Sequence, residues 1–201
     1  DGVSAASLAL AFEELLGGGS ALLPLLQPHA QRLASLIKGL TLHPVAQLLL
    51  TAAQTARPEH YAHAVAAMAL NGALMVAGGG DDAAVRLALL CGLLHDVGEM
   101  YIGPEHGEAE ADRDLDFASY QQLVVHPHVG SLLLAQLTNY PADVARAVAE
   151  HHERLDQSGY PNALAGRQMS TQGRLLAVTE ATLNALRSPY SHLLHASVAL
   201  R

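Results

Sequence analysis

The sequence predicts an all-α protein. Half of the 201 residues are hydrophobic, with leucine and alanine dominating, and both have a high intrinsic helix propensity. Aromatic residues make up only 4% of the chain and tryptophan is absent, which speaks against a β-sandwich, because packed strands favour aromatic and β-branched side chains. The length suits one domain, or one domain with a short helical extension.

The N-terminal part is expected to form helices that carry no chemistry. Apolar residues have helical spacing over 4–16, and a run of three glycines ends that segment. Leucine- and alanine-rich segments then continue to about residue 57. We therefore expect residues 1–56 to form an N-terminal helical extension and residues 57–201 to form the functional domain.

Two apolar helices are predicted in the middle of the chain. Pro58 stands where a first-turn proline is tolerated, and the helix that follows over 59–77 ends at three consecutive glycines. Either Asp81 or Asp82 is expected to cap the next helix, whose leucines lead into His95 and Asp96.

The C-terminal half is expected to alternate helices with polar turns. The acidic segment 103–116 has the composition of a loop that could act as a lid. Further helices are expected over 117–137 with a break at His126-Pro127, after Pro141 up to His151-His152, and over 174–186, with a turn at 157–161.

The charge and the single cysteine exclude several classes of protein. A formal net charge of -8, with 11 lysines and arginines, argues against a general nucleic-acid binder, although bound metal could supply the charge for a small anionic ligand. Cys91 alone excludes an internal disulfide and fits a reducing compartment; its apolar neighbours predict a buried thiol, the alternative being a reactive one. Without a membrane-spanning run or a basic signal segment, we expect a cytoplasmic protein with no membrane partner.

Histidines and carboxylates stand at the predicted helix ends. His95 and Asp96 close an apolar helix, and because neighbouring residues on a helix diverge by about 100°, they can share a metal only near a helix end or between two ions. Glu59 and His63 lie four apart on one helical face, whereas His60 is expected to point elsewhere.

The remaining candidates are His126 before a proline, the doublet His151-His152, and Glu180 in an apolar helix. Each alone is more often a hydrogen-bonded core residue than a ligand. Together they indicate convergence on cations, because buried imidazoles and carboxylates are costly without a partner, and mixed nitrogen and oxygen ligands suit Mn, Fe or Zn.

These motifs resemble the HD-GYP branch of the HD superfamily of metal-dependent phosphohydrolases, of which the chain would be a divergent member. The resemblance covers about 57–190 and lies in Leu93-Leu94-His95-Asp96-Val97-Gly98, His126-Pro127, and His151-His152-Glu153-Arg154-Leu155-Asp156-Gln157-Ser158-Gly159-Tyr160-Pro161. Glu59 and His63 also resemble the opening Glu-x-x-x-His of members that bind three metals.

The resemblance implies an HD-domain helical bundle over 57–201 that hydrolyses cyclic di-GMP, a bacterial second messenger. It implies two or three divalent transition metals, Fe or Mn, with Zn or Ni as alternatives. His63, His95, Asp96 and Glu180 would surround one metal, Asp96 would bridge to a second completed by His126, His151 and His152, and Glu59 would serve a third.

The resemblance also makes His95 and Asp96 the catalytic pair. Two cations about 3.5–4 Å apart can hold a bridging hydroxide and neutralise the charge of a phosphodiester. Substrate-binding residues would be Glu99, Arg154, Tyr160 and Arg187. The partner would be a small nucleotide, and a homodimer or a fused regulatory domain is left open.

The chain departs from the family pattern His-Asp-x-Gly-Lys at Glu99, which stands in place of the lysine. Glu99 could pair with Arg154 or Arg174, ligate a metal, or be solvated, and the first and last of these are favoured. Glu180 likewise stands in place of an aspartate. The alternative function is therefore a degenerate, non-catalytic signalling module that binds a nucleotide or a protein partner, as in the HDOD branch; a general HD nucleotidase is a third.

Overall fold

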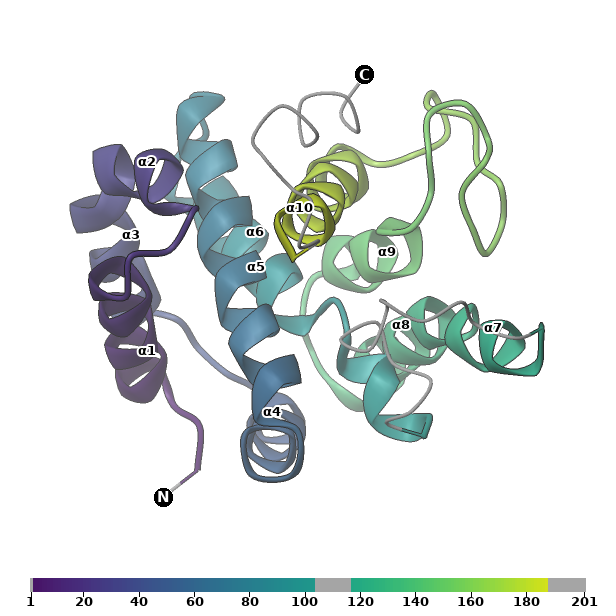
Figure 1. Cartoon of the computed structure of the whole chain (residues 1–201), viewed down its shortest axis with the longest axis horizontal. Coiled ribbons are helices and arrows are strands. Elements are labelled where there is room, and N and C mark those ends of the chain that lie inside the picture. Colours follow the sequence, from purple (N-terminus) through teal and green to yellow (C-terminus); the bar gives the residue numbers. More distant parts are fainter. Residues whose placement is uncertain (1, 104–116, 188–201) are drawn as a thin grey trace.

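The computed structural model describes residues 2–103 and 117–187, and helices are the only regular secondary structure in these ranges (Figure 1). Those residues form no strand, and the only pairing of β type is an isolated bridge between Asp156 and Ala165. The predicted all-α class is confirmed. The elements are α1 (Ala5–Gly17), α2 (Leu23–Leu26), the 3-10 helix η1 (Gln27–His29), α3 (Ala30–Lys38), α4 (Pro44–Ala56), α5 (Pro58–Ala77), α6 (Asp82–Leu94), the 3-10 helix η2 (Val97–Tyr101), α7 (Phe117–Leu123), α8 (His126–Leu137), α9 (Ala142–Glu150) and α10 (Thr171–Arg187).

Helices α5 and α6 pack closely against each other in the centre of the molecule. Two glycines allow the close approach: a Cβ on Gly72 would lie 2.6 Å from the Leu89 side chain, and one on Gly92 would lie 2.5 Å from the Ala67 carbonyl oxygen. A buried polar chain also joins this pair to α10, since Asn71 donates to the Ala88 carbonyl and accepts from Thr179. The central pair therefore fixes where the end of α6 lies.

The N-terminal helices form a layer on one side of α5, as Figure 1 shows. The layer begins with a capping box, in which the Ser4 and Ser7 side chains satisfy each other's backbone amides. Its buried side chains, among them Phe12, Leu33 and Ile37, belong to the same core cluster as the apolar residues of α5 and α6. The division at residue 56 stays a prediction.

Helices α8, α9 and α10 lie on the other side of α5 and α6 (Figure 1). Helix α8 packs on α9 and on η2, and α10 packs on α9, α5 and α6. Gly98 in η2 touches the backbone of α8, where an added Cβ would overlap the His126 carbonyl oxygen. This contact brings the residues after α6 against the start of α8.

Helix ends follow the predicted signals with small shifts. Asp81 is the N-cap of α6 and accepts from the Ala84 amide, whereas Asp82 lies in the first turn and pairs with Arg32. The expected break at His126-Pro127 is the start of α8, and α10 starts at Thr171, three residues before the prediction.

Three further expectations concern the cysteine, membrane-spanning helices and the acidic segment 103–116. Cys91 is fully buried, as predicted, and burial raises the pKa of its thiol to about 12. No helix in the described ranges combines the length and apolar character that crossing a bilayer requires. Of the predicted lid over 103–116, all but the first residue lies outside the described residues.

Candidate metal centre

The centre begins at the end of α6. His95 is the C-cap of this helix and Asp96 precedes η2, and their side chains are 0% and 2% exposed. The helix stops between them, so the two side chains can turn toward one place although they are neighbours. The two oxygens of Asp96 also serve different neighbours, with Oδ2 3.0 Å from His95 Nε2 and Oδ1 3.4 Å from His126 Nε2. Asp96 thus links two groups of side chains.

The first group consists of His63, His95, Asp96 and Glu180, from α5, the end of α6 and α10. Glu180 Oε2 lies 2.9 Å from His63 Nε2 and 3.0 Å from His95 Nε2. All four side chains are buried, and one nitrogen or oxygen from each lies within 4.8 Å of the others. Two imidazoles and two carboxylates therefore offer ligand atoms to one point.

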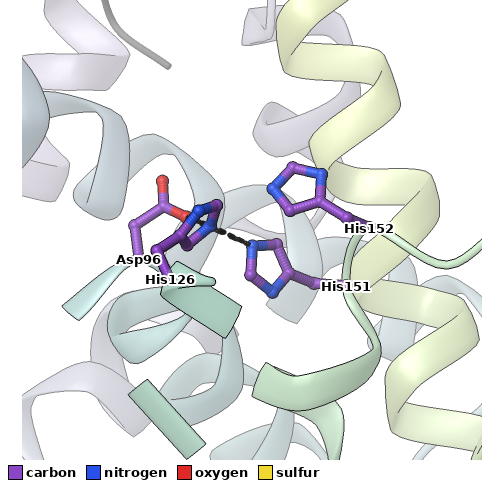
Figure 2. A group of neighbouring side chains, drawn as sticks. All are labelled: Asp96, His126, His151 and His152. Carbon is purple, nitrogen blue, oxygen red and sulfur yellow. Dashed lines mark hydrogen bonds and ion pairs between the residues drawn. The ribbon is translucent and has the colours of Figure 1, made fainter. Parts of the chain in front are cut away.

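The second group consists of Asp96, His126, His151 and His152, also all buried (Figure 2). His126 begins α8, and the histidine doublet follows the end of α9, so that the three rings and the carboxylate converge. His126 Nε2 is 3.1 Å from His151 Nε2, and His151 Nε2 is 3.3 Å from Asp96 Oδ1. This group offers three imidazoles and one carboxylate.

Backbone carbonyls orient three of the imidazole rings in the same way. The Nδ1 atoms of His95, His126 and His151 lie 2.7, 2.7 and 2.6 Å from the carbonyl oxygens of Gly92, Leu123 and Val148, each three residues earlier. A carbonyl oxygen only accepts, so each Nδ1 carries a proton and the neutral ring keeps its lone pair on Nε2. Metal-binding histidines are held by the same kind of contact.

This tautomer leaves the Nε2 lone pairs of His126 and His151 facing each other at 3.1 Å. Two lone pairs at that distance repel unless a cation lies between or beside them. In addition, Glu180 Oε1 is buried and has no hydrogen-bond partner in the described part of the chain, an arrangement that costs free energy in a chain without metal. Both observations fit a metal centre.

The pKa values show how the charges compensate one another. Burial opposes the ionisation of Asp96, but the charge of His95 outweighs it and holds the Asp96 pKa well below its usual range. Burial likewise opposes the ionisation of Glu180, but the charge of His63 outweighs it and holds the Glu180 pKa well below its usual range.

The pKa of a histidine is shifted in opposite directions in the two groups. Burial, and then the charge of His152, lowers the pKa of His151 to about 3, which keeps the ring neutral as a metal ligand must be. Burial also disfavours charge on His95, but Asp96 and Glu180 outweigh it and raise the His95 pKa well above its ordinary value. A metal in the first group would therefore replace a proton on His95 Nε2.

A loop after α9 closes over the histidine doublet. Tyr160 stacks on His152, with ring centroids 4.6 Å apart and an interplanar angle of 17°. The Tyr160 amide donates to the His152 carbonyl, and a Cβ on Gly159 would overlap that same carbonyl. The predicted turn at 157–161 thus lies against the second group, and Tyr160 lies on a ligand ring; its substrate-binding role stays a prediction.

Two buried glutamates that the sequence analysis did not single out hold this loop. Glu153 accepts from the Asn162 and Leu164 amides at 2.7 and 2.8 Å. Glu150 accepts from the amide and hydroxyl of Ser170, both at 2.7 Å. Both glutamates flank the histidine doublet, and Glu153 also lies within the motif that begins at this doublet; these are the sequence signals that could have drawn attention to them.

In the first turn of α5, Glu59 and His60 are not placed as expected. Glu59 is exposed and belongs to none of the groups of metal-ligand type among the described residues, whereas His60 is buried. The inward position is taken by the residue three before His63 rather than the residue four before it. Glu59 and His63 do lie four apart on one helix, so the role of Glu59 at a third metal stays a prediction, whereas the expectation that His60 points elsewhere is wrong.

Glu99 is also placed differently from the favoured expectation. It is 2% exposed, so it is not solvated, and its Oε2 atom lies 3.2 Å from His60 Nδ1. Neither Arg154 nor Arg174 is its partner: Arg154 donates to the carbonyls of His151 and Glu153, and Arg174 donates to the Gly166 carbonyl and the Thr171 hydroxyl.

Arg154 lines a cavity of about 410 Å³ between the loop and α10. Arg174 lines the same cavity, together with apolar residues of the loop and helix such as Leu155 and Ala177. Its lining also includes the side chains of Glu153, Asp156 and Ser158, so this cavity carries charges of both signs among apolar residues. Arg187 ends α10, and its side chain lies outside the described residues.

The sequence of this chain is similar to those of three bacterial phosphodiesterases. A cyclic di-GMP phosphodiesterase of Pseudomonas aeruginosa, PA4108, is 35% identical over 177 residues, which is 86% of this chain and 42% of that protein. The cyclic di-GMP phosphodiesterase response regulator RpfG of Xanthomonas campestris is 32% identical over 97 residues, 48% of this chain and 25% of that protein. The 3'3'-cGAMP-specific phosphodiesterase 3 of Vibrio cholerae is 28% identical over 88 residues, 44% of this chain and 18% of that protein.

The chain thus spans less than half the length of these relatives. A family model described as the HD domain matches residues 23–201, which includes every residue of both ligand groups. The resemblance to the HD-GYP branch is confirmed. By its matched residues and by the helices that hold them, the chain belongs to the HD domain family.

Proposed function

We propose that this domain is a metal-dependent phosphodiesterase that hydrolyses cyclic di-GMP to the linear dinucleotide or GMP. One observation carries the proposal: two buried ligand groups share Asp96, which is the arrangement that a pair of metal ions needs. The names of the Pseudomonas and Xanthomonas relatives support the substrate. A bacterial, cytoplasmic setting belongs to the same proposal, since this substrate is an internal second messenger of bacteria.

The residues fit divalent transition metals. His63, His95, Asp96 and Glu180 would hold one ion, and Asp96 with His126, His151 and His152 would hold the other. Nitrogen-rich sets with one or two carboxylates suit Fe or Mn, and also accept Zn or Ni. When bound, two such ions supply Lewis acidity, an activated water nucleophile and charge for the phosphodiester.

The chain's own residues would bind and orient the substrate. Because the protein carries a formal net charge of -8, a dianionic ligand needs local positive charge, which Arg154 offers beside the histidine doublet. Tyr160 keeps the His152 ring in place by stacking on it. Arg187 is proposed to bind a phosphate, as the resemblance implies.

The proposal is tested by turnover with matched variants. Protein reconstituted anaerobically with Mn(II) or Fe(II) is expected to cleave cyclic di-GMP. Asp96→Asn should reduce turnover to background, because it weakens both ligand groups at once. His128→Ala is the control, because His128 is exposed and lies on the same helix as His126. Undiminished cleavage by Asp96→Asn would refute the proposal.

The Vibrio relative raises the question of the cyclic dinucleotide that is cleaved. A panel of cyclic di-GMP, 3'3'-cGAMP and mononucleotides decides this, and the panel also tests the reading as a general HD nucleotidase. We expect cyclic di-GMP to be cleaved fastest. Preference for mononucleotides would replace the cyclic-dinucleotide proposal with the nucleotidase.

A second candidate is a non-catalytic signalling module, and Glu99 is the residue that favours it, because a buried carboxylate replaces the expected cation. Metal content and turnover separate the two candidates. Two or more bound metals with cleavage exclude the non-catalytic module, whereas a metal-free protein that binds cyclic di-GMP without cleaving it would establish it.

A further inference from the structure

Two exposed aromatic rings lie on one side of the short helix α7. Phe117 and Tyr120 are 75% and 45% exposed, although aromatic residues make up only 4% of the chain. Residues three apart on a helix lie on the same face, so the two rings belong to one aromatic face of α7. Such a face is available for contact with a ligand.

This face adjoins the second ligand group through a chain of rings. The Tyr120 ring meets the Tyr160 ring edge to face, with centroids 6.3 Å apart and an interplanar angle of 73°. Tyr160 in turn stacks on His152, which belongs to the second ligand group. Because the tyrosine pair is edge to face and Tyr120 is nearly half exposed, part of the Tyr120 ring stays open to solvent beside the metal centre.

The proposed substrate has parts that the metal centre does not recognise. Metal ions bind its phosphodiester oxygens, whereas its two purine bases are flat and largely apolar and bind best by stacking on aromatic rings. A single ribose separates each base from the phosphate. A phosphodiester held at the second ligand group therefore places a base within reach of rings that lie one and two contacts from His152.

We propose that Tyr120 binds substrate by stacking its ring on one purine base of the cyclic dinucleotide, with Phe117 extending the aromatic face. This inference rests on the proposed function and deepens it, because it names the part of the substrate that α7 recognises. The base is stacked both in the bound substrate and in the transition state. The contact therefore lowers KM without changing kcat.

Steady-state kinetics with two substrates test the stacking role. One substrate is cyclic di-GMP, and the other is methyl p-nitrophenyl phosphate, a phosphodiester without a purine, whose only ring is in the leaving group. In Mn(II)-loaded full chain, Tyr120→Leu is expected to raise KM for cyclic di-GMP by about 5- to 150-fold with kcat unchanged, the range that loss of one base stack implies. Both constants for methyl p-nitrophenyl phosphate, and the bound Mn, should stay at wild-type values.

Two further variants serve as matched controls. Tyr120→Phe keeps the ring and should keep the wild-type KM for cyclic di-GMP. Tyr101→Leu makes the same substitution at another exposed tyrosine, in η2, and should leave both substrates unaffected.

The other outcomes separate this inference from the proposed function. A wild-type KM for cyclic di-GMP in Tyr120→Leu, or an equal rise in Tyr101→Leu, overturns the stacking role and leaves the phosphodiesterase standing. Loss of bound Mn from Tyr120→Leu, with slower cleavage of both substrates, also overturns it and shows that Tyr120 supports Tyr160 instead. A wild type that cleaves neither substrate overturns the proposed function and the stacking role together.

Discussion

The two ligand groups share Asp96 but are built in different ways. His63 and Glu180 of the first group lie within long helices, α5 and α10, whose positions are set by the core. His126, His151 and His152 of the second group lie at helix ends, and the doublet depends on a loop that two glutamates tether. Helix packing positions the first group, whereas local hydrogen bonds position the second.

The groups also differ in charge. Glu180 belongs to the first group alone, whereas the only carboxylate of the second group is the shared Asp96, so more of the charge of an ion in the first group is neutralised than of an ion in the second. This difference suggests a division of roles, in which the first ion is held more firmly and the second attracts the anionic substrate.

Single-ligand variants should break the centre one group at a time. Glu180→Gln is expected to remove the first ion and leave the second, and His151→Gln to do the opposite. Both should reduce turnover to background, because in-line attack needs both ions. Metal analysis with activity measurement checks this. Loss of both ions from either variant would mean that the groups are not separable.

Loosening the loop should affect the second group alone. Glu153→Gln weakens the charge-assisted bonds to the Asn162 and Leu164 amides. Metal affinity of the second group should fall by about 10–100-fold, the usual cost of losing a supporting contact around a metal ligand. Titration with Mn(II) measures this fall. An equal fall in the first group would show that Glu153 supports the whole fold.

The pH dependence of metal binding should separate the groups again. The His95 pKa lies well above its ordinary value in the metal-free chain, so an ion in the first group must displace a proton. Its affinity should fall by about tenfold for each unit of pH lowered below that pKa. His151, with a pKa of about 3, is already neutral, so its contribution to the second group should not change above pH 5. Calorimetry in buffers of different ionisation enthalpy counts the released protons.

The smallest effect is expected at Tyr160. Tyr160→Phe keeps the ring that stacks on His152 and should leave metal binding unchanged, whereas Tyr160→Leu removes the stack and should weaken the second ion by a few-fold, on the scale of about 0.5–1.5 kcal/mol for a ring pair. If Tyr160→Phe is as impaired in cleavage as Tyr160→Leu but retains its metals, the hydroxyl acts on the substrate instead.

Much of the centre followed from the sequence. The motifs around His95, His126 and His151 are long enough to identify, and the structure brings them together with His63 and Glu180. The choice between Glu59 and His60 could not be made, because positions three and four before His63 both lie on its side of a helix. Only the burial of the turn decides between them.

Other features depend on contacts between distant parts of the chain. Glu99 contacts His60, which is 39 residues away, and no local pattern indicates that contact. Glu153 and Glu150 bind backbone amides, which are present at nearly every residue and so leave no mark in the sequence. Helix existence was predicted better than the identity of partners, because apolar spacing is local and pairing is not.

Gly98 has a consequence for how the centre tolerates change. Its backbone lies directly on the start of α8, with no side chain between them. The spacing between the two ligand groups is therefore set by main chain against main chain, and substitutions of surrounding side chains leave it unaltered. Relatives can vary the pocket and its charges, as at Glu99, while the span that a bridging carboxylate must cover stays constant.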